Sequence, residues 1–192
     1  MIKRELYMSR IRPFIGGELI KEMTGIRRRG KSVMLDLIKE ELVESGIDSA
    51  QFISINFEDM RYAYLCNAQV LHEEILHRAE TIQGKVYLFF DEIQEVKDWE
   101  KCINSLRVAL DCDIYITGSN AKLLSGELAT YLGGRYVEFV IYPFSFAEFL
   151  ELYRPIAPQA SIQQCFQKYL LSGGMPYLAN LRYAEEPSRQ YL

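Results

Sequence analysis

Apolar residues along this chain fall into short continuous runs that are separated by stretches of helical spacing. The runs predict five β-strands, at residues 19–24, 51–57, 86–90, 113–117 and 135–140. The run at 86–90 is unbroken, which is typical of a strand buried on both faces of a parallel sheet. The pattern therefore predicts an α/β fold.

Helical spacing predicts the elements between these strands. Apolar residues at i, i+3 and i+7 predict one helix from Leu35 to Gly46 and a second within residues 60–83. The same spacing predicts a third helix from Trp99 to Leu110 and a fourth through Tyr131. Helices alternating with strands are typical of a parallel sheet covered on both faces.

The chain changes character at Pro143, beyond which only helical spacing remains, with Pro155 and Pro158 marking a linker between two helices. We therefore expect a sheet domain at residues 1–142 and a helical lid at residues 143–192. The last residues are polar and form no closing element, so we expect the protein to continue into a further domain.

One glycine-containing stretch organises the chain. It fits G-x-x-x-x-G-K-[ST], the phosphate-binding loop, and lies between a predicted strand and a predicted helix, as that motif requires. The glycines allow a tight turn whose amides can face phosphate oxygens. The predicted nucleotide-binding residues are Gly25, Ile26, Arg27, Arg28, Arg29, Gly30, Lys31, Ser32 and Val33.

Individual side chains of this stretch have distinct expected roles. Lys31 can reach the β- and γ-phosphates, and the Ser32 hydroxyl can join the coordination shell of Mg²⁺. A chance match in a basic turn is the alternative. Three consecutive arginines repel one another in an ordinary turn and are better accounted for beside a polyphosphate.

Two acids follow the buried strand at 86–90. Asp91 could hold Mg²⁺, directly or through water, and Glu92 could orient or deprotonate an attacking water. The alternative is a solvated turn after a core strand. Because a phosphate loop precedes them in the chain, we favour the functional interpretation.

Two further positions are candidates for catalysis. Asn120 follows a buried strand and could sense the γ-phosphate, although it or Ser119 could instead cap a helix. Arg135 follows two glycines and could serve as an arginine finger, or lie in a surface ion pair. The sequence leaves open whether Arg135 acts within its own chain or on a neighbour.

The overall charge argues against two classes of partner. The net charge is −4 and the isoelectric point is near 5.4, so no general attraction to nucleic acid or to an anionic membrane is implied. Four cysteines are far apart and lack metal-ligand spacing. No secretory signal or membrane-length apolar run is present, so we expect a cytoplasmic protein.

Residues 1–18 form a basic, partly aromatic segment. Such a segment can fold against the adenine side of a nucleotide, but a flexible N-terminus is the commoner outcome.

Together these motifs resemble the prokaryotic AAA-like ATPases, in which an ATPase domain precedes a C-terminal domain of unknown function. The resemblance covers about residues 4–182. It is carried by Gly25 to Ser32, Phe90 to Gln94, Trp99, Ile116 to Asn120, Leu132 to Arg135 and Tyr142 to Phe146.

The resemblance implies a three-layer α/β/α P-loop NTPase with sheet order 5-1-4-3-2. It implies ATP rather than GTP, Mg²⁺ as cofactor and Glu92 as catalytic base. Gly174-Met175-Pro176 is similar to a Gly-x-Pro element in the lid of related ATPases, which would bring Pro176 near the nucleotide.

We therefore expect Mg²⁺-dependent ATP binding and hydrolysis that drives a conformational switch of a larger protein. Its partners would be its own C-terminal domain, an unknown protein and, in a homo-oligomer, further copies of itself. The alternatives are a nucleotide-binding regulatory switch with negligible hydrolysis and a DNA-acting ATPase, which the acidic composition disfavours.

Overall fold

A parallel five-stranded sheet forms the centre of the molecule, seen here in a computed structural model that describes residues 2–27, 29–119 and 133–176. The strands are β1 (Ile20–Thr24), β2 (Phe52–Asn56), β3 (Val86–Asp91), β4 (Cys112–Gly118) and β5 (Tyr136–Val140). Their order is β2-β3-β4-β1-β5, which confirms the predicted order 5-1-4-3-2. β4 therefore lies between β1 and β3.

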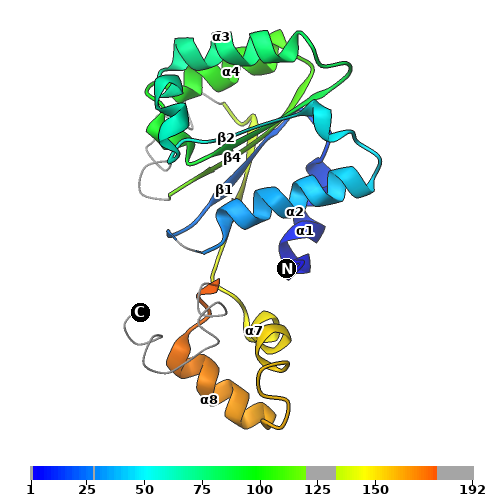
Figure 1. Cartoon of the computed structure of the whole chain (residues 1–192), viewed down its shortest axis with the longest axis vertical. Coiled ribbons are helices and arrows are strands. Elements are labelled where there is room, and N and C mark those ends of the chain that lie inside the picture. Colours follow the sequence, from blue (N-terminus) through cyan, green and yellow to red (C-terminus); the bar gives the residue numbers. More distant parts are fainter. Residues whose placement is uncertain (1, 28, 120–132, 177–192) are drawn as a thin grey trace.

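Helices cover both faces of the sheet, which gives the three-layer α/β/α arrangement expected from the sequence (Figure 1). The helices of the described residues are α1 (Glu5–Ile11), α2 (Lys31–Glu44), α3 (Ala68–Ala79), α4 (Trp99–Ala109), α7 (Phe146–Tyr153) and α8 (Ile162–Ser172). The short 3-10 turns are η1 (Arg12–Phe14), η2 (Ser49–Gln51), η3 (Met60–Leu65) and η4 (Ile93–Glu95). α3 and α4 lie on one face, and α1 and α2 on the other (Figure 1).

Each face of the sheet has its own hydrophobic core. Leu88 and Ile114 point into the cluster beneath α3 and α4. Phe89 and Tyr115 point into the cluster beneath α1 and α2, where their rings stack with centroids 4.9 Å apart. Because alternate residues of a strand face opposite sides, a strand buried on both faces must be apolar throughout.

The N-terminal segment is ordered, so the expectation of a flexible N-terminus is wrong for residues 5–14. α1 places Tyr7, Met8 and Ile11 in the core beneath α2. The burial of these three side chains compensates for the entropy of ordering the segment.

A buried ion pair joins the amino ends of β1 and β4. Lys21 Nζ pairs with Asp113, and both side chains are completely buried. Asp113 Oδ2 also accepts hydrogen bonds from Gly16 N–H and Tyr115 Oη, each at 2.7 Å. The pair is thus fully hydrogen-bonded, which such a buried pair needs to be tolerated.

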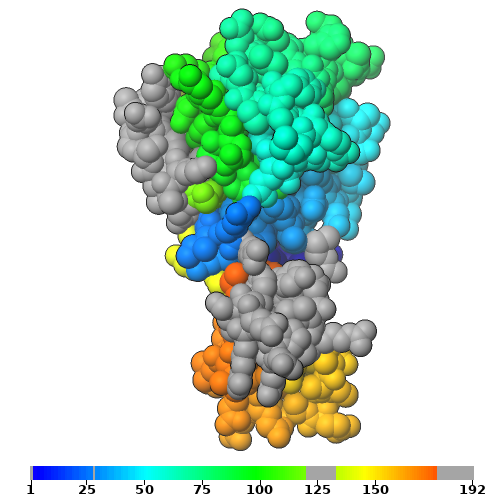
Figure 2. Space-filling model, turned by 60° about the vertical axis from the view of Figure 1, so that its left-hand side comes forward, coloured from blue at the N-terminus to red at the C-terminus, as the bar shows by residue number. Residues whose placement is uncertain are grey.

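α7 and α8, which we refer to as the helical pair, extend from one end of the sheet domain (Figures 1 and 2). Capping boxes start both helices, with Ser145 at α7 and Ser161 at α8. The pair has a separate small core around Phe149 and Cys165. Its packing is therefore largely independent of the sheet.

β1 also carries a buried acid. Glu22 is only 3% exposed and lies opposite Glu138 of β5. Burial, and to a smaller extent the charge of Glu138, raises the pKa of Glu22 from 4.5 to about 7. The folded protein therefore holds this proton at pH values where the unfolded chain has lost it.

This pKa predicts a pH-dependent effect of Glu22→Gln. As pH rises from 4.5 to 7, the Glu22 carboxyl ionises in the unfolded chain but stays protonated in the folded protein. The free energy of unfolding of the wild type should therefore fall relative to that of the variant over this range. Above pH 7 the variant should be more stable by about 3 kcal/mol. Urea unfolding across this range measures the difference. The exposed control Glu40→Gln should show none, and a pH-independent difference for Glu22→Gln would contradict the assignment.

Candidate functional site

The predicted phosphate loop connects β1 to α2. Gly25 has φ +147°, and a Cβ at this position would lie 2.5 Å from the Ile141 carbonyl oxygen. Only glycine accommodates both the conformation and the contact. Gly30 precedes α2 and provides no side-chain cap, so the first amides of α2 remain available to a ligand.

The arginines of the loop differ in their surroundings. Arg27 is exposed and pairs with Glu58 at 2.6 Å. The Nε atom of Arg29 is buried and has no hydrogen-bond partner among the residues that the structure describes. A buried donor without an acceptor is costly, and an anion at the loop would satisfy it. Arg28 lies outside the described residues.

Lys31 is the first residue of α2 and is 4% exposed. Its Nζ donates to the Gly25 carbonyl at 3.3 Å and lies 3.4 Å from Glu92 Oε1. These long contacts leave the ammonium group incompletely coordinated. Lys31 is thus held across its own loop with donor capacity left for a further acceptor.

Asp91 ends β3 and is buried. It accepts a hydrogen bond from the Thr117 hydroxyl, and hydrogen bonding with the Ser32 hydroxyl also acts on its pKa. Burial raises the pKa of Asp91 above its ordinary value, the charge of Glu92 contributes to the rise, and the two hydrogen bonds and Lys31 oppose it. A buried carboxylate beside a hydroxyl matches the oxygen ligands that Mg²⁺ prefers, and a cation there would favour the ionised acid.

Glu92 has a left-handed backbone, with φ 55° and ψ 49°. Such a conformation is strained for a residue with a side chain and is common at functional sites. Its amide donates to Thr117 Oγ1 at 3.0 Å, and its Oε2 accepts from Gln94 Nε2 at 2.6 Å. The carboxylate is therefore oriented between Gln94 and Lys31.

Thr117 is a site residue that sequence reasoning missed. It lies in β4, is fully buried, and bonds to both acids, donating to Asp91 and accepting from the Glu92 amide. The available signal was its position at the carboxyl end of a strand, shortly before the polar residues Ser119 and Asn120 that were predicted instead. Ser119 is half-buried, and Asn120 lies outside the described residues.

Arg135 is not near the loop of its own chain. It lies exposed just before β5, and its carbonyl accepts from Ile20 N–H at the amino end of β1. The length of β1, about 16 Å, separates it from the loop. Its Nη1 donates to Asn104 at 3.3 Å. A role as arginine finger on its own chain's nucleotide is therefore wrong geometrically.

Pro176 does approach the loop. Its Cγ would lie 3.7 Å from a Cβ built on Gly30. The helical pair ends just before this residue, so the chain returns from α8 to the phosphate loop.

A cavity of about 560 Å³ opens where α1, the connection after β5 and the helical pair meet. It is lined by Leu6, Tyr7, Tyr142, Pro143, Phe144, Ser145, Glu148, Tyr169, Leu170, Gly173 and Gly174. Arg4 links this cavity to the loop, since its guanidinium bonds to both Glu148 and the Arg29 carbonyl.

The described part of the chain lacks two other kinds of feature. No helix there is long and apolar enough to cross a membrane. The same residues contain no group of three or more His, Cys, Asp or Glu side chains placed to hold a metal ion. Any Mg²⁺ at Asp91 and Ser32 would therefore need oxygen ligands from water or a bound phosphate.

Comparison with protein families gives one match, to the AAA domain, over residues 18–150. The chain is 41% identical over 190 residues to an uncharacterized protein of Haemophilus influenzae, covering 99% of this chain and 47% of that protein. It is 36% identical over 165 residues to the uncharacterized protein MJ1544 of Methanocaldococcus jannaschii, covering 82% of this chain and 35% of that protein. The chain thus spans less than half the length of these curated relatives.

Solved structures share the fold at low identity. A Hsp104:casein complex of S. cerevisiae in an extended conformation matches with a TM-score of 0.59 and 15% identity, covering 94% of this chain and 36% of that chain. A mutant of Thermotoga maritima RuvB matches with a TM-score of 0.57 and 17% identity, covering 97% and 59%. At such identities the likeness concerns the fold alone.

The bridging position of Thr117 leads to a test with Thr117→Val, which keeps the shape and removes the hydroxyl. The Glu92 amide loses its acceptor and Asp91 a donor, so the free energy of unfolding should fall by about 1–3 kcal/mol. Urea unfolding measures the loss. Thr81→Val is the matched control, because the Thr81 hydroxyl is exposed and donates to the Arg78 carbonyl of its own turn. Equal losses in both variants would show that Thr117 does not hold the acids.

Proposed function

This chain belongs to the family of AAA domains, and from that premise we propose that it binds ATP with Mg²⁺ and hydrolyses it. The observation that supports the proposal most is the meeting of Lys31, Asp91 and Glu92 at the amino end of α2. These residues come from segments about sixty positions apart in the chain. Phosphoryl transfer needs a cation on the phosphates, an acid that holds Mg²⁺ and a group that orients water, and Lys31, Asp91 and Glu92 could supply these in turn.

The loop supplies positive groups for the phosphates. Lys31 would exchange its long contact with Glu92 for a phosphate oxygen, and the orphaned Nε of Arg29 would gain an acceptor. The backbone amides from Gly25 to Val33 and the dipole of α2 add to this field. Binding thus turns incompletely satisfied donors into charge-assisted hydrogen bonds.

Ser32 and Asp91 are the residues that would hold Mg²⁺. Bound there, the ion would neutralise the charge that develops on the phosphates. Thr117 fixes the Asp91 carboxylate in place through its hydroxyl.

Glu92 is the proposed base. Once Lys31 turns to the phosphates, the Glu92 carboxylate, still oriented by Gln94, is free to accept a proton from the attacking water. The Glu92 Oε1 atom lies 3.4 Å from Lys31 of the loop, and the residue has a strained left-handed backbone of the kind common at functional sites.

We propose that the cavity beside the loop holds the adenine base of the nucleotide. Its lining is rich in aromatic and apolar groups, and the helical pair forms one wall. The pair would act as a lid, with Pro176 approaching the phosphates. The choice of ATP over GTP rests on the family resemblance.

In the longer protein, we propose that lid movement switches the C-terminal domain and an unknown protein partner in the cytoplasm. We further propose that Arg135, which lies at the amino end of β1, acts on the nucleotide of a neighbouring chain in a homo-oligomer.

Lys31→Ala should weaken ATP binding about 10- to 100-fold, because one charge-assisted contact is lost. Titration calorimetry with Mg²⁺ and ATP measures this. Lys39→Ala is the matched control, because Lys39 lies on the same helix but bonds to Asp36 and Ser54. Unchanged affinity in Lys31→Ala would refute the site.

Glu92→Gln separates hydrolysis from binding. The variant should bind ATP and lose about 100- to 10,000-fold in turnover, since the amide cannot accept the proton. Phosphate release under saturating ATP measures turnover. If the wild type binds ATP tightly but releases no phosphate, the function is that of a nucleotide-binding switch without hydrolysis.

A further inference from the structure

Arg4 is only 2% exposed, which is unusual for an arginine. It precedes α1 in a left-handed conformation, with φ 46° and ψ 48°. Burying a guanidinium is costly unless its donors are all engaged. The partners of Arg4 show where this cost is offset.

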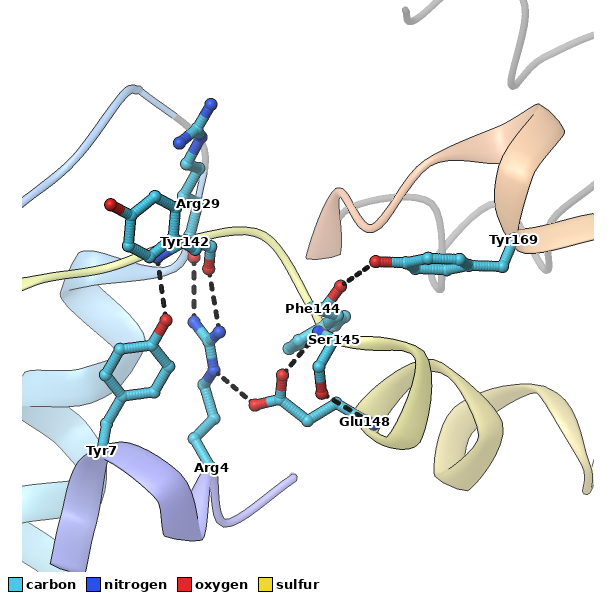
Figure 3. A network of polar contacts seen from close by, with 8 residues as sticks. All are labelled: Arg4, Tyr7, Arg29, Tyr142, Phe144, Ser145, Glu148 and Tyr169. Carbon is cyan, nitrogen blue, oxygen red and sulfur yellow. Dashed lines mark hydrogen bonds and ion pairs between the residues drawn. The ribbon is translucent and has the colours of Figure 1, made fainter. Parts of the chain in front are cut away.

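The guanidinium of Arg4 contacts three separate parts of the molecule (Figure 3). Nε donates to Glu148 Oε1 of α7 at 2.9 Å. Nη1 donates to the Arg29 carbonyl of the phosphate loop at 3.2 Å, and Nη2 to the Tyr142 carbonyl after β5 at 2.9 Å. A single side chain thus joins the loop, the connection and the helical pair.

Aromatic groups fix the guanidinium in place. Its Cζ lies 4.6 Å from the ring centroid of Tyr7 and 5.2 Å from that of Phe144. Tyr7 Oη in turn accepts from the Tyr142 amide at 3.0 Å (Figure 3). Cation–π contacts with desolvated rings favour the charged group in this position.

Glu148 transmits the position of Arg4 to α7. Its second oxygen, Oε2, accepts from the Ser145 amide at 2.7 Å, which closes the capping box that starts the helix. A shift of the Arg4 guanidinium therefore moves the first turn of α7 or breaks the ion pair.

α8 is attached to the same connection through Phe144. The Phe144 carbonyl accepts from Tyr169 Oη at 2.9 Å, and its amide donates to the Gly174 carbonyl at 2.6 Å. A Cβ on Gly174 would lie 2.2 Å from the Phe144 carbonyl oxygen, so the backbones are in direct contact. The helical pair and the connection should thus move together.

The phosphate loop completes the link. Arg4 Nη1 and Pro176 Cγ would each lie 3.7 Å from a Cβ on Gly30. The two groups reach the loop at the residue that precedes Lys31, from the N-terminal segment and from the end of the helical pair.

We propose that Arg4 is a positioning residue that sets the placement of the helical pair against the phosphate loop. Because the Arg4 guanidinium bonds to both the Arg29 carbonyl and Glu148, a movement of the loop would shift Glu148 and with it the first turn of α7. The nucleotide-dependent part of this proposal rests on the proposed function, whereas the placement of the pair without nucleotide does not.

The first experiment measures that placement without nucleotide. Spin labels at Glu44→Cys on α2 and Gln167→Cys on α8, both exposed positions, report their separation by double electron–electron resonance. The background carries Cys66→Ser, because the other three native cysteines are buried. The labelled wild type should give one narrow distance distribution.

Arg4→Met should broaden this distribution, and so should Arg4→Lys, because an ammonium group cannot reproduce three diverging directional contacts. Thermal unfolding monitored at the sheet checks that both variants fold. Arg12→Met is the matched control, since Arg12 lies on the same N-terminal segment but pairs with Glu5 and Glu41 of the sheet domain. A narrow, unshifted distribution in folded Arg4 variants would overturn the proposal.

The second experiment adds Mg²⁺ and a non-hydrolysable ATP analogue. The wild type and Arg12→Met should change their label distance on binding, whereas Arg4→Lys should bind the analogue, by calorimetry, without that change. An equal change in Arg4→Lys would overturn the transmission. If the wild type fails to bind the analogue, the proposed function fails, and the distances without nucleotide still decide the placement role of Arg4.

Discussion

In a parallel sheet the carboxyl ends of all strands lie at one edge, and this constraint determines where the candidate site of this protein can lie. β1 leads there to the phosphate loop and β3 to its two acids. Because β4 is inserted between them, Thr117 lies between loop and acids and bonds to both Asp91 and Glu92. The order of the strands thus builds the site, and the ligand crevice is expected outside these carboxyl ends.

Buried charges at the two ends of the sheet show what distinguishes a structural pair from a functional one. At the amino end, Lys21 donates to Asp113 and to the Gly17 carbonyl, and Asp113 also accepts from the Gly16 amide and the Tyr115 hydroxyl. Among the described residues, the polar contacts of Lys31 at the carboxyl end are longer, at 3.3 and 3.4 Å. Full coordination stabilises the first pair in one arrangement, whereas incomplete coordination leaves Lys31 able to exchange partners.

The sequence predicted what is locally encoded and missed what depends on distant partners. The five strands follow from apolar runs and the glycine loop from a specific motif, whereas the strand order was implied by the family resemblance. α1 and Arg4 could not be predicted, because their order depends on α2 and Glu148, far along the chain. The sequence prediction left open whether Arg135 acts on its own chain, although a residue that precedes its strand must lie at the amino edge of a parallel sheet, away from the loop.

The central claim is that the loop binds the phosphates of a nucleotide, and the melting temperature with AMP, ADP and ATP, each with Mg²⁺, tests it directly. A ligand that binds only the folded state raises the melting temperature, and at equal concentration a tighter ligand raises it more, with the logarithm of the ratio of concentration to Kd. Since the positive groups surround Lys31, AMP should have almost no effect, and ADP and ATP should stabilise progressively more. Equal stabilisation by AMP and ATP, or none by any nucleotide, would contradict the account.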